Sequence, residues 1–135
     1  MEPAIQALMA ARTIAVVGLD SRTNREAYRI AVYLRDAGYR VIPVHRGRFP
    51  ADEVLGEKAY ESLRDIAEHV DLVDVFVRSE ETGPVIEDAI AIAAGAIWLQ
   101  QAIYNDGGLE RARAAGLVAI EDACTMVEHR LQLRA

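Results

Sequence analysis

Arginine side chains follow a glycine in one loop of the chain, a combination that suits the binding of phosphate groups. The loop runs from Gly18 to Arg25 and also contains Arg22. It lies between a predicted buried strand and a predicted helix, and the free N–H groups and dipole of a helix N-terminus attract phosphate. Neither a Gly-x-Gly-x-x-Gly dinucleotide fingerprint nor a P-loop is present, because only Gly18 is in place. The alternative is an ordinary loop with solvated arginines.

A second basic loop follows the next predicted strand and contains His45, Arg46 and Arg48. An NAD site usually has an acid here, which binds the adenosine ribose. Cations suit an additional ribose phosphate instead, either the 2′-phosphate of NADP or the 3′-phosphate of coenzyme A. A basic surface turn is the alternative.

Two further strand ends carry aromatic or polar side chains. Phe76 and Arg78 end a predicted strand, where Arg78 either binds a ligand or forms an ion pair with Glu80 or Glu81. Gln100 ends the following strand, and its amide either binds a ligand or bonds to neighbouring backbone.

Catalytic constellations are difficult to find in the chain. The three histidines, at 45, 69 and 129, show no metal-ligand spacing, and Ser21 lacks a nucleophile elbow. Cys124 and His129 form a conceivable thiol–imidazole pair, although a lone cysteine beside a capping box is more often structural. We therefore identify no catalytic residue and no metal ligand, and a binding module is favoured over an enzyme.

These loops must be positioned by strands and helices that alternate along the chain. Continuous apolar runs predict strands at 13–18, 40–44, 72–77, 96–100 and 117–120, with a short edge strand at 58–60. Helical spacing predicts helices within 23–38, 82–95 and 105–116, a short helix at 62–68, a short terminal helix that begins near 125, and an N-terminal helix within 1–12 that packs on the sheet. Thr23 with Glu26, and Thr125 with Glu128, predict capping boxes.

Buried strands that alternate with helices imply right-handed crossovers and a parallel sheet. We predict a single α/β domain over residues 1–135, doubly wound, with a mainly parallel sheet and helices on both faces. Ligands of such sheets bind outside the carboxyl ends of the strands, where the strand order reverses. This rule selects the loops described above.

Composition excludes several classes of protein. The 135 residues, 52% of them hydrophobic, fit one compact domain, and a single cysteine cannot form an internal disulfide. The longest apolar run, 89–99, is about half a membrane span. We therefore expect a cytoplasmic protein without a membrane partner.

Charge is distributed unevenly around a net value of −6. Residues 1–50 carry eight arginines against four acids, a net charge of +4, whereas residues 51–135 carry a net charge of −10. We expect no nucleic-acid partner for an acidic chain, but the basic half suits a small phosphorylated ligand.

An ordered set of motifs resembles a known family. The motifs, all read from the sequence, are Ile14-Ala15-Val16-Val17-Gly18-Leu19, Arg25 and Tyr28, Gly38-Tyr39-Arg40-Val41-Ile42-Pro43-Val44, Val54-Leu55-Gly56-Glu57-Lys58, Val70-Asp71-Leu72-Val73-Asp74-Val75-Phe76-Val77-Arg78, Ile97-Trp98-Leu99-Gln100 and Cys124-Thr125-Met126-Val127-Glu128-His129. Together they look like the small stand-alone CoA-binding proteins, which are similar to the CoA-binding domain of the succinyl-CoA synthetase α subunit.

The resemblance implies a Rossmann-like domain with coenzyme A, or an acyl-CoA, as its ligand. Carried over by position, the implied ligand-binding residues are Gly18, Leu19, Asp20, Ser21, Arg25, Pro43, His45, Arg46, Phe76, Val77, Arg78 and Gln100. The chain departs from the family's Ser-Pro-Lys at Asp20-Ser21-Arg22, which places an acid where phosphate approaches. Two alternatives therefore stay open: an NADP-binding enzyme or redox sensor, and a protein-interaction domain that has lost its nucleotide, for which the sequence identifies no protein partner.

Overall fold

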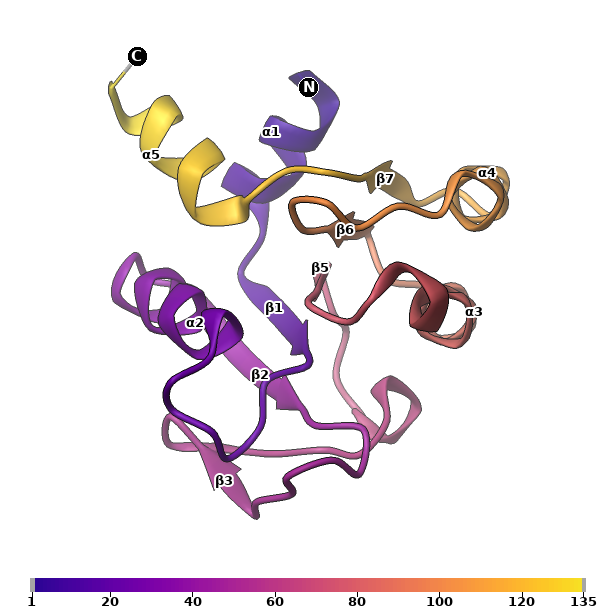
Figure 1. Ribbon diagram of the computed structural model, residues 1–135. Coiled ribbons are helices and arrows are strands. Elements are labelled where there is room, and N and C mark those ends of the chain that lie inside the picture. Colours follow the sequence, from indigo (N-terminus) through magenta and orange to yellow (C-terminus); the bar gives the residue numbers. More distant parts are fainter. Residues whose placement is uncertain (1, 135) are drawn as a thin grey trace.

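The computed structural model describes residues 2–134, which form five α-helices and two 3-10 turns around a five-stranded parallel sheet (Figure 1). The sheet has the order β2-β1-β5-β6-β7, and β3 pairs with β4 in a separate hairpin. None of the described helices is long and apolar enough to cross a membrane. The elements, in chain order, are α1 (Glu2–Ala10), β1 (Thr13–Val17), α2 (Glu26–Asp36), β2 (Arg40–Val44), β3 (Glu53–Val54), β4 (Glu57–Lys58), η1 (Leu63–Asp65), β5 (Leu72–Val75), η2 (Ser79–Glu81), α3 (Thr82–Ala91), β6 (Ala96–Leu99), α4 (Asp106–Ala114), β7 (Val118–Ile120) and α5 (Thr125–Arg134).

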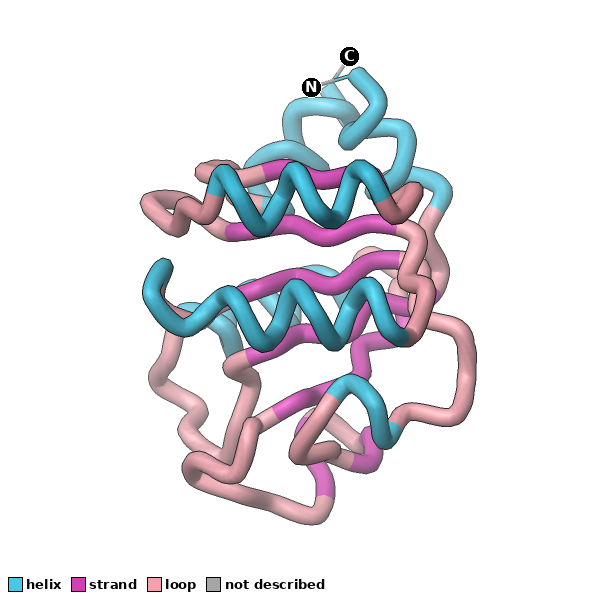
Figure 2. Tube along the Cα trace, turned by 90° about the vertical axis from the view of Figure 1, so that its right-hand side faces the viewer, coloured by secondary structure: helices cyan, strands magenta, loops and turns pink. Residues whose placement is uncertain are grey.

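Helices cover both faces of the sheet. In Figure 1, α1, α2 and α5 lie on one side and α3 and α4 on the other, and Figure 2 shows α3 and α4 running along the strands. Successive strand residues supply the two cores, since Ile14 and Val16 pack with the first group of helices and Ala15 and Val17 with the second. The predicted doubly wound, Rossmann-like α/β fold is confirmed.

The strand order reverses beside β1. The chain passes from β1 to the edge strand β2 and returns to β5 on the other side of β1. Val17, the last residue of β1, is paired in register with Val44 and Val75, the last residues of β2 and β5. The loops that follow these three strands therefore leave the sheet side by side, at the place where doubly wound proteins bind ligands.

The short elements between β2 and β5 differ from the prediction. The expected strand at 58–60 is the two-residue strand β4 followed by one parallel bridge between Tyr60 and Val44. The expected helix at 62–68 is the single 3-10 turn η1, whose N-cap hydroxyl on Ser62 accepts a hydrogen bond from Arg64 N–H. Both elements are too short for hydrophobic periodicity to define.

The two predicted capping boxes are wrong. Helix α2 begins at Glu26, with Arg25 at the N-cap position and no side-chain cap, so Thr23 lies outside the helix. Thr125 is the first residue of α5, and its hydroxyl donates to Asp74 Oδ2 at 2.9 Å. In a capping box this hydroxyl would accept from the N–H of Glu128, but here it accepts from Gln100 Nε2 at 2.9 Å while it donates to Asp74, so tertiary contacts determine where it points.

Asp74, Gln100 and Thr125 form a buried cluster that attaches α5 to the sheet. Gln100 Nε2 donates to Asp74 Oδ1 at 2.6 Å and to Thr125 Oγ1 at 2.9 Å, and Asp74 is fully buried in the middle of β5. Beside the cluster, Trp98 Nε1 donates to Ala123 O at 2.9 Å. Burial raises the pKa of Asp74 to about 7, although the hydrogen bonds from Gln100 and Thr125 act in the opposite direction.

The raised pKa of Asp74 predicts a pH-dependent stability. A carboxyl group with a folded-state pKa above its unfolded value contributes stability at pH below about 4, and this stability is lost as the pH rises through about 7. The full effect is up to about 4 kcal/mol. In Asp74→Asn, the amide group can accept from Gln100 and donate to Thr125 at every pH. We expect the free energy of unfolding, measured in urea, to fall more for the wild type than for Asp74→Asn between pH 5 and pH 8.

The comparison of the two proteins isolates this carboxyl group. Burial lowers the pKa of His129, so this residue makes the folded state more stable as the pH rises. His129 is present in the wild type and in Asp74→Asn, so its effect is the same in both. Parallel pH profiles for the wild type and Asp74→Asn would contradict the prediction.

Candidate functional site

A cleft of about 240 Å³ opens at the carboxyl ends of β1, β2 and β5. Its walls are the loops that follow these strands, together with the turn η2 that leads into α3. The residues that line it are Gly18, Asp20, Arg22, Arg25, His45, Arg46, Arg48, Phe49, Phe76, Val77, Arg78 and Glu81. Five arginines and two carboxylates give the lining a formal excess of three positive charges.

Gly18 is the point at which the three strand ends meet. Its N–H donates to Val44 O at 2.9 Å, and Phe76 N–H donates to Val17 O at 2.8 Å. The φ of Gly18 is +101°, and a Cβ on this residue would lie 3.1 Å from both Cβ and O of Phe76. Only glycine combines this backbone conformation with this close approach.

The N-terminus of α2 opens beside Gly18. Arg25 occupies the N-cap position in an extended conformation, and no side chain caps the helix. A second hollow of about 250 Å³ adjoins this helix end, and Gly18, Asn24, Arg25, Ala27 and Phe76 are among its lining residues. The first N–H groups of an uncapped helix lack intrahelical partners and are available to an anion.

Asp20 is neutralised inside the first loop. It is 3% exposed, and its carboxylate accepts hydrogen bonds from the N–H, Nε and Nη2 of Arg22 at 3.0, 3.0 and 2.7 Å. Burial alone would raise the pKa of Asp20, but the hydrogen bonds from Arg22 and the charges of Arg22 and Arg25 outweigh it and lower that pKa. The guanidinium of Arg22 also stacks on the ring of Phe49, 3.9 Å from its centroid. The acid expected to meet phosphate is therefore already paired.

Glu81 draws together the arginines of the other two loops. Its carboxylate lies 3.2 Å from Arg48, 3.4 Å from Arg78 and 3.7 Å from Arg46. The sequence left Arg78 either a ligand or an ion pair with Glu80 or Glu81, and both ion pairs exist, since Glu80 also lies 3.4 Å from Arg78. The pairs of Glu81 with Arg46 and Arg48 had no signal in the sequence.

His45 lies at the edge of the cleft with a defined tautomer. Its Nδ1 accepts a hydrogen bond from Gly47 N–H at 2.9 Å, which places the proton of the neutral ring on Nε2. His45 also lines a wider depression of about 890 Å³ against the β3–β4 hairpin. That depression contains Asp52, Glu53 and Glu61 but only Lys58 as a permanent cation, so it attracts anions less than the arginine-lined cleft.

The structure brings most of the predicted site residues together. Gly18, Asp20, Arg25, His45, Arg46, Phe76, Val77 and Arg78 all line the cleft. Leu19 and Pro43 are buried behind it, and Ser21 is exposed, with its N–H bonded to Phe49 O at 3.0 Å.

Gln100 is not brought to the cleft. It is 5% exposed, and its amide nitrogen is occupied by Asp74 and Thr125. Conversely, Arg22, Arg48, Phe49 and Glu81 line the cleft but are absent from the set of residues that the family resemblance implies. The sequence had already placed Arg22 and Arg48 in the two basic loops, whereas Phe49 and Glu81 were not singled out for binding.

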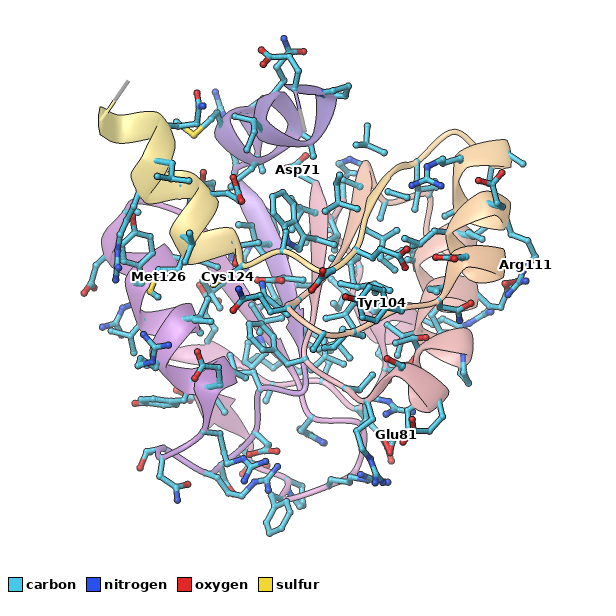
Figure 3. The ribbon with its side chains drawn as sticks, turned by 45° about the horizontal axis from the view of Figure 1, so that its top comes forward. Asp71, Glu81, Tyr104, Arg111, Cys124 and Met126 are labelled. Carbon is cyan, nitrogen blue, oxygen red and sulfur yellow. The ribbon has the colours of Figure 1, made fainter. Side chains whose placement is uncertain are left out.

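The hypothesis of a Cys124–His129 pair is not supported. Cys124 is buried between the last strand and α5 (Figure 3). The ring of His129 instead hydrogen-bonds through Nδ1 to the hydroxyl of Tyr33 at 2.8 Å, and it packs edge-on against Tyr33 and Tyr39. Both residues serve the core on the α2 and α5 side of the sheet.

Comparisons with known proteins agree with this architecture. A family model described as a CoA binding domain matches residues 12–130. The Bacillus subtilis (strain 168) protein YneT is 37% identical over 122 residues, which are 90% of this chain and 88% of YneT. A solved structure from Thermus thermophilus has 37% identity and a TM-score of 0.87, covering 96% of each chain. Another, from Pyrococcus horikoshii OT3, has 34% identity and a TM-score of 0.90, covering 98% of this chain and 92% of the other.

The position of Gly18 predicts an unusually costly alanine substitution. In Gly18→Ala, the new methyl group meets the Phe76 backbone in addition to the strain of a positive φ. We expect an unfolding free energy roughly 2–4 kcal/mol below that of the wild type in chemical denaturation.

Gly38→Ala is the matched control, because Gly38 has a φ of +105° and no atom within 4 Å of the added Cβ. Gly38→Ala should lower the free energy of unfolding by only about 1–2 kcal/mol. Equal losses in the two variants would show that the contact with Phe76 imposes no constraint.

Proposed function

The chain belongs to the CoA-binding domain family, and from this membership we propose that it binds coenzyme A, or an acyl-CoA, in the cleft at the ends of β1, β2 and β5. The observation that carries the proposal is the gathering of five arginines from three loops around Gly18, with only two carboxylates among them. Coenzyme A has a pyrophosphate and a separate 3′-phosphate, and a site with excess guanidinium groups favours such a polyanion.

The pyrophosphate is assigned to the first loop and the start of α2. Gly18 offers no side chain to obstruct the approach, the helix lacks a side-chain cap, and Arg25 adds a positive charge at the same place. Because the pKa of Asp20 is lowered, this residue is ionised near neutral pH. Its pairing with Arg22 leaves the pair close to neutral, so it does not oppose the ligand.

The 3′-phosphate is assigned to the loop after β2. Arg46 and Arg48 lie on this loop, and the Nε2 proton of His45 is a further donor there. Phe76 and Val77 supply apolar surface to the cleft, while Leu19 and Pro43 support it from behind. In this proposal Gln100 acts indirectly, through the cluster that holds α5.

Binding without chemistry is the function that we propose for these residues. Both carboxylates of the cleft are engaged by arginine, Asp20 with Arg22 and Glu81 with three guanidinium groups. Asp20 is a poor proton acceptor, because its hydrogen bonds with Arg22 lower its pKa.

Thermal unfolding with coenzyme A, dephospho-CoA, NADP and NAD at equal millimolar concentrations tests the proposal. A ligand at about 100 times its dissociation constant stabilises the folded state by roughly 2.7 kcal/mol, which raises the midpoint by several degrees. We expect the largest shift with coenzyme A and a smaller one with dephospho-CoA. A larger shift with NADP would favour a dinucleotide-binding function, and no shift with any ligand would favour a protein-interaction domain.

Substitution of Arg46 tests the assignment of the 3′-phosphate. Arg46→Gln should weaken coenzyme A binding roughly tenfold in calorimetric titration while leaving dephospho-CoA binding nearly unchanged, because only the former ligand has this phosphate. Arg35→Gln is the matched control, since Arg35 lies near the far end of α2 and, within residues 2–134, forms an ion pair with Asp36 alone, at 3.5 Å. Equal losses for both ligands would place the 3′-phosphate elsewhere.

A further inference from the structure

Glu81 occupies a central position among the arginines of the cleft. It is the last residue of η2, and its side chain is 17% exposed. Figure 3 shows Glu81 at the lower end of α3, among side chains that carry nitrogen atoms. Its Oε1 lies 3.2 Å from Arg48 Nη2 and 3.4 Å from Arg78 Nη2, and its Oε2 lies 3.7 Å from Arg46 Nη1.

The carboxylate of Glu81 has the surroundings that proteins provide for a bound oxyanion. Guanidinium groups from two separate loops approach its two oxygens, and within residues 2–134 Arg46 and Arg48 form ion pairs with no other acid. Glu81 is shared by three guanidinium groups, and Arg78 also pairs with Glu80, so one positive charge is left uncompensated. The cluster therefore already contains an anion of its own but retains attraction for a stronger one.

A phosphate monoester is the stronger anion. It carries a charge of about −1.5 to −2 at pH 7 and three acceptor oxygens, whereas a carboxylate carries one charge and two oxygens. The ion pairs of Glu81 have lengths of 3.2–3.7 Å, and Arg48 and Arg78 are largely exposed, so each pair is individually weak. The phosphate can therefore replace the carboxylate between the guanidinium groups.

We propose that Glu81 is an internal competitor, which a ligand phosphate monoester displaces from Arg46, Arg48 and Arg78. The inference rests on the proposed function, since it takes the 3′-phosphate of coenzyme A as that monoester. A ligand without this phosphate leaves Glu81 in place and gains nothing from the three arginines. Weak anions therefore do not displace Glu81 from the three arginines, whereas a dianionic group does.

Calorimetric titration of Glu81→Gln with coenzyme A and dephospho-CoA, at fixed ionic strength, tests this inference. Because competition is removed, the variant should bind coenzyme A roughly three- to tenfold more tightly than the wild type. Its affinity for dephospho-CoA should remain within about twofold of the wild-type value. Tighter binding of both ligands by the same factor, or weaker binding of coenzyme A, would overturn the proposal, the latter because it would make Glu81 an organiser of the arginines.

Glu80→Gln is the matched control. It removes the same charge from the adjacent residue, which is 69% exposed and contacts only Arg78 among the three arginines. Its affinities should equal those of the wild type. If Glu80→Gln tightens coenzyme A binding as much as Glu81→Gln does, the effect is one of net charge, and the proposal fails.

A second variant and a second probe separate this inference from the proposed function. Glu81→Asp keeps the charge but withdraws the carboxylate by one methylene, so it should also bind coenzyme A more tightly than the wild type. Inorganic phosphate replaces coenzyme A in a thermal unfolding series, in which Glu81→Gln should be stabilised at several-fold lower phosphate concentration than the wild type. Absence of coenzyme A binding with this phosphate response intact would refute the proposed function alone, and loss of the phosphate response would refute the role of Glu81.

Discussion

The contact between Gly18 and Phe76 is the constraint on which the cleft depends. Gly18 N–H binds the last residue of β2, and the backbone of Phe76 approaches so closely that a Cβ on Gly18 would lie 3.1 Å away. Every loop that contributes an arginine leaves the sheet within a few residues of this junction. The separation of the guanidinium groups therefore follows from how tightly three parallel strand ends converge, and a side chain at Gly18 would alter that separation before it altered any ligand contact.

The buried cluster of Asp74, Gln100 and Thr125 links the cleft to the opposite end of the chain. Asp74 lies two residues before Phe76 on the same face of the sheet, and Thr125 begins the last helix. Fixing α5 on that face closes the core around β5 and supports the strand end from which Phe76 and Arg78 project. A polar group in this core is tolerated because each of its hydrogen-bonding partners is present, and the described residues contain no buried side-chain nitrogen or oxygen without a partner.

The two acids of the cleft differ in a way that has consequences for binding. Asp20 is nearly buried and forms short hydrogen bonds with a single arginine two residues away, so its charge is cancelled locally. Glu81 shares its charge among three arginines at longer distances. The first pair is a fixed part of the loop, while the second group can be rearranged by a stronger anion. Both arrangements depend on the charges close to each acid, so the net charge of −6 of the whole chain does not indicate the positive charge of the cleft.

The sequence by itself determined the alternation of strands and helices, the parallel sheet, the loops that form the cleft and the importance of Gly18. These features follow from local rules, namely apolar periodicity, strand-to-helix alternation and the special conformations of glycine. Only the tertiary structure decided that Thr23 and Thr125 do not cap helices, that Gln100 binds Asp74, and that Glu81 joins arginines up to 35 positions away in the chain. A polar side chain bonds to the strongest partner within reach in space, and the order of residues along the chain does not specify which partner that is.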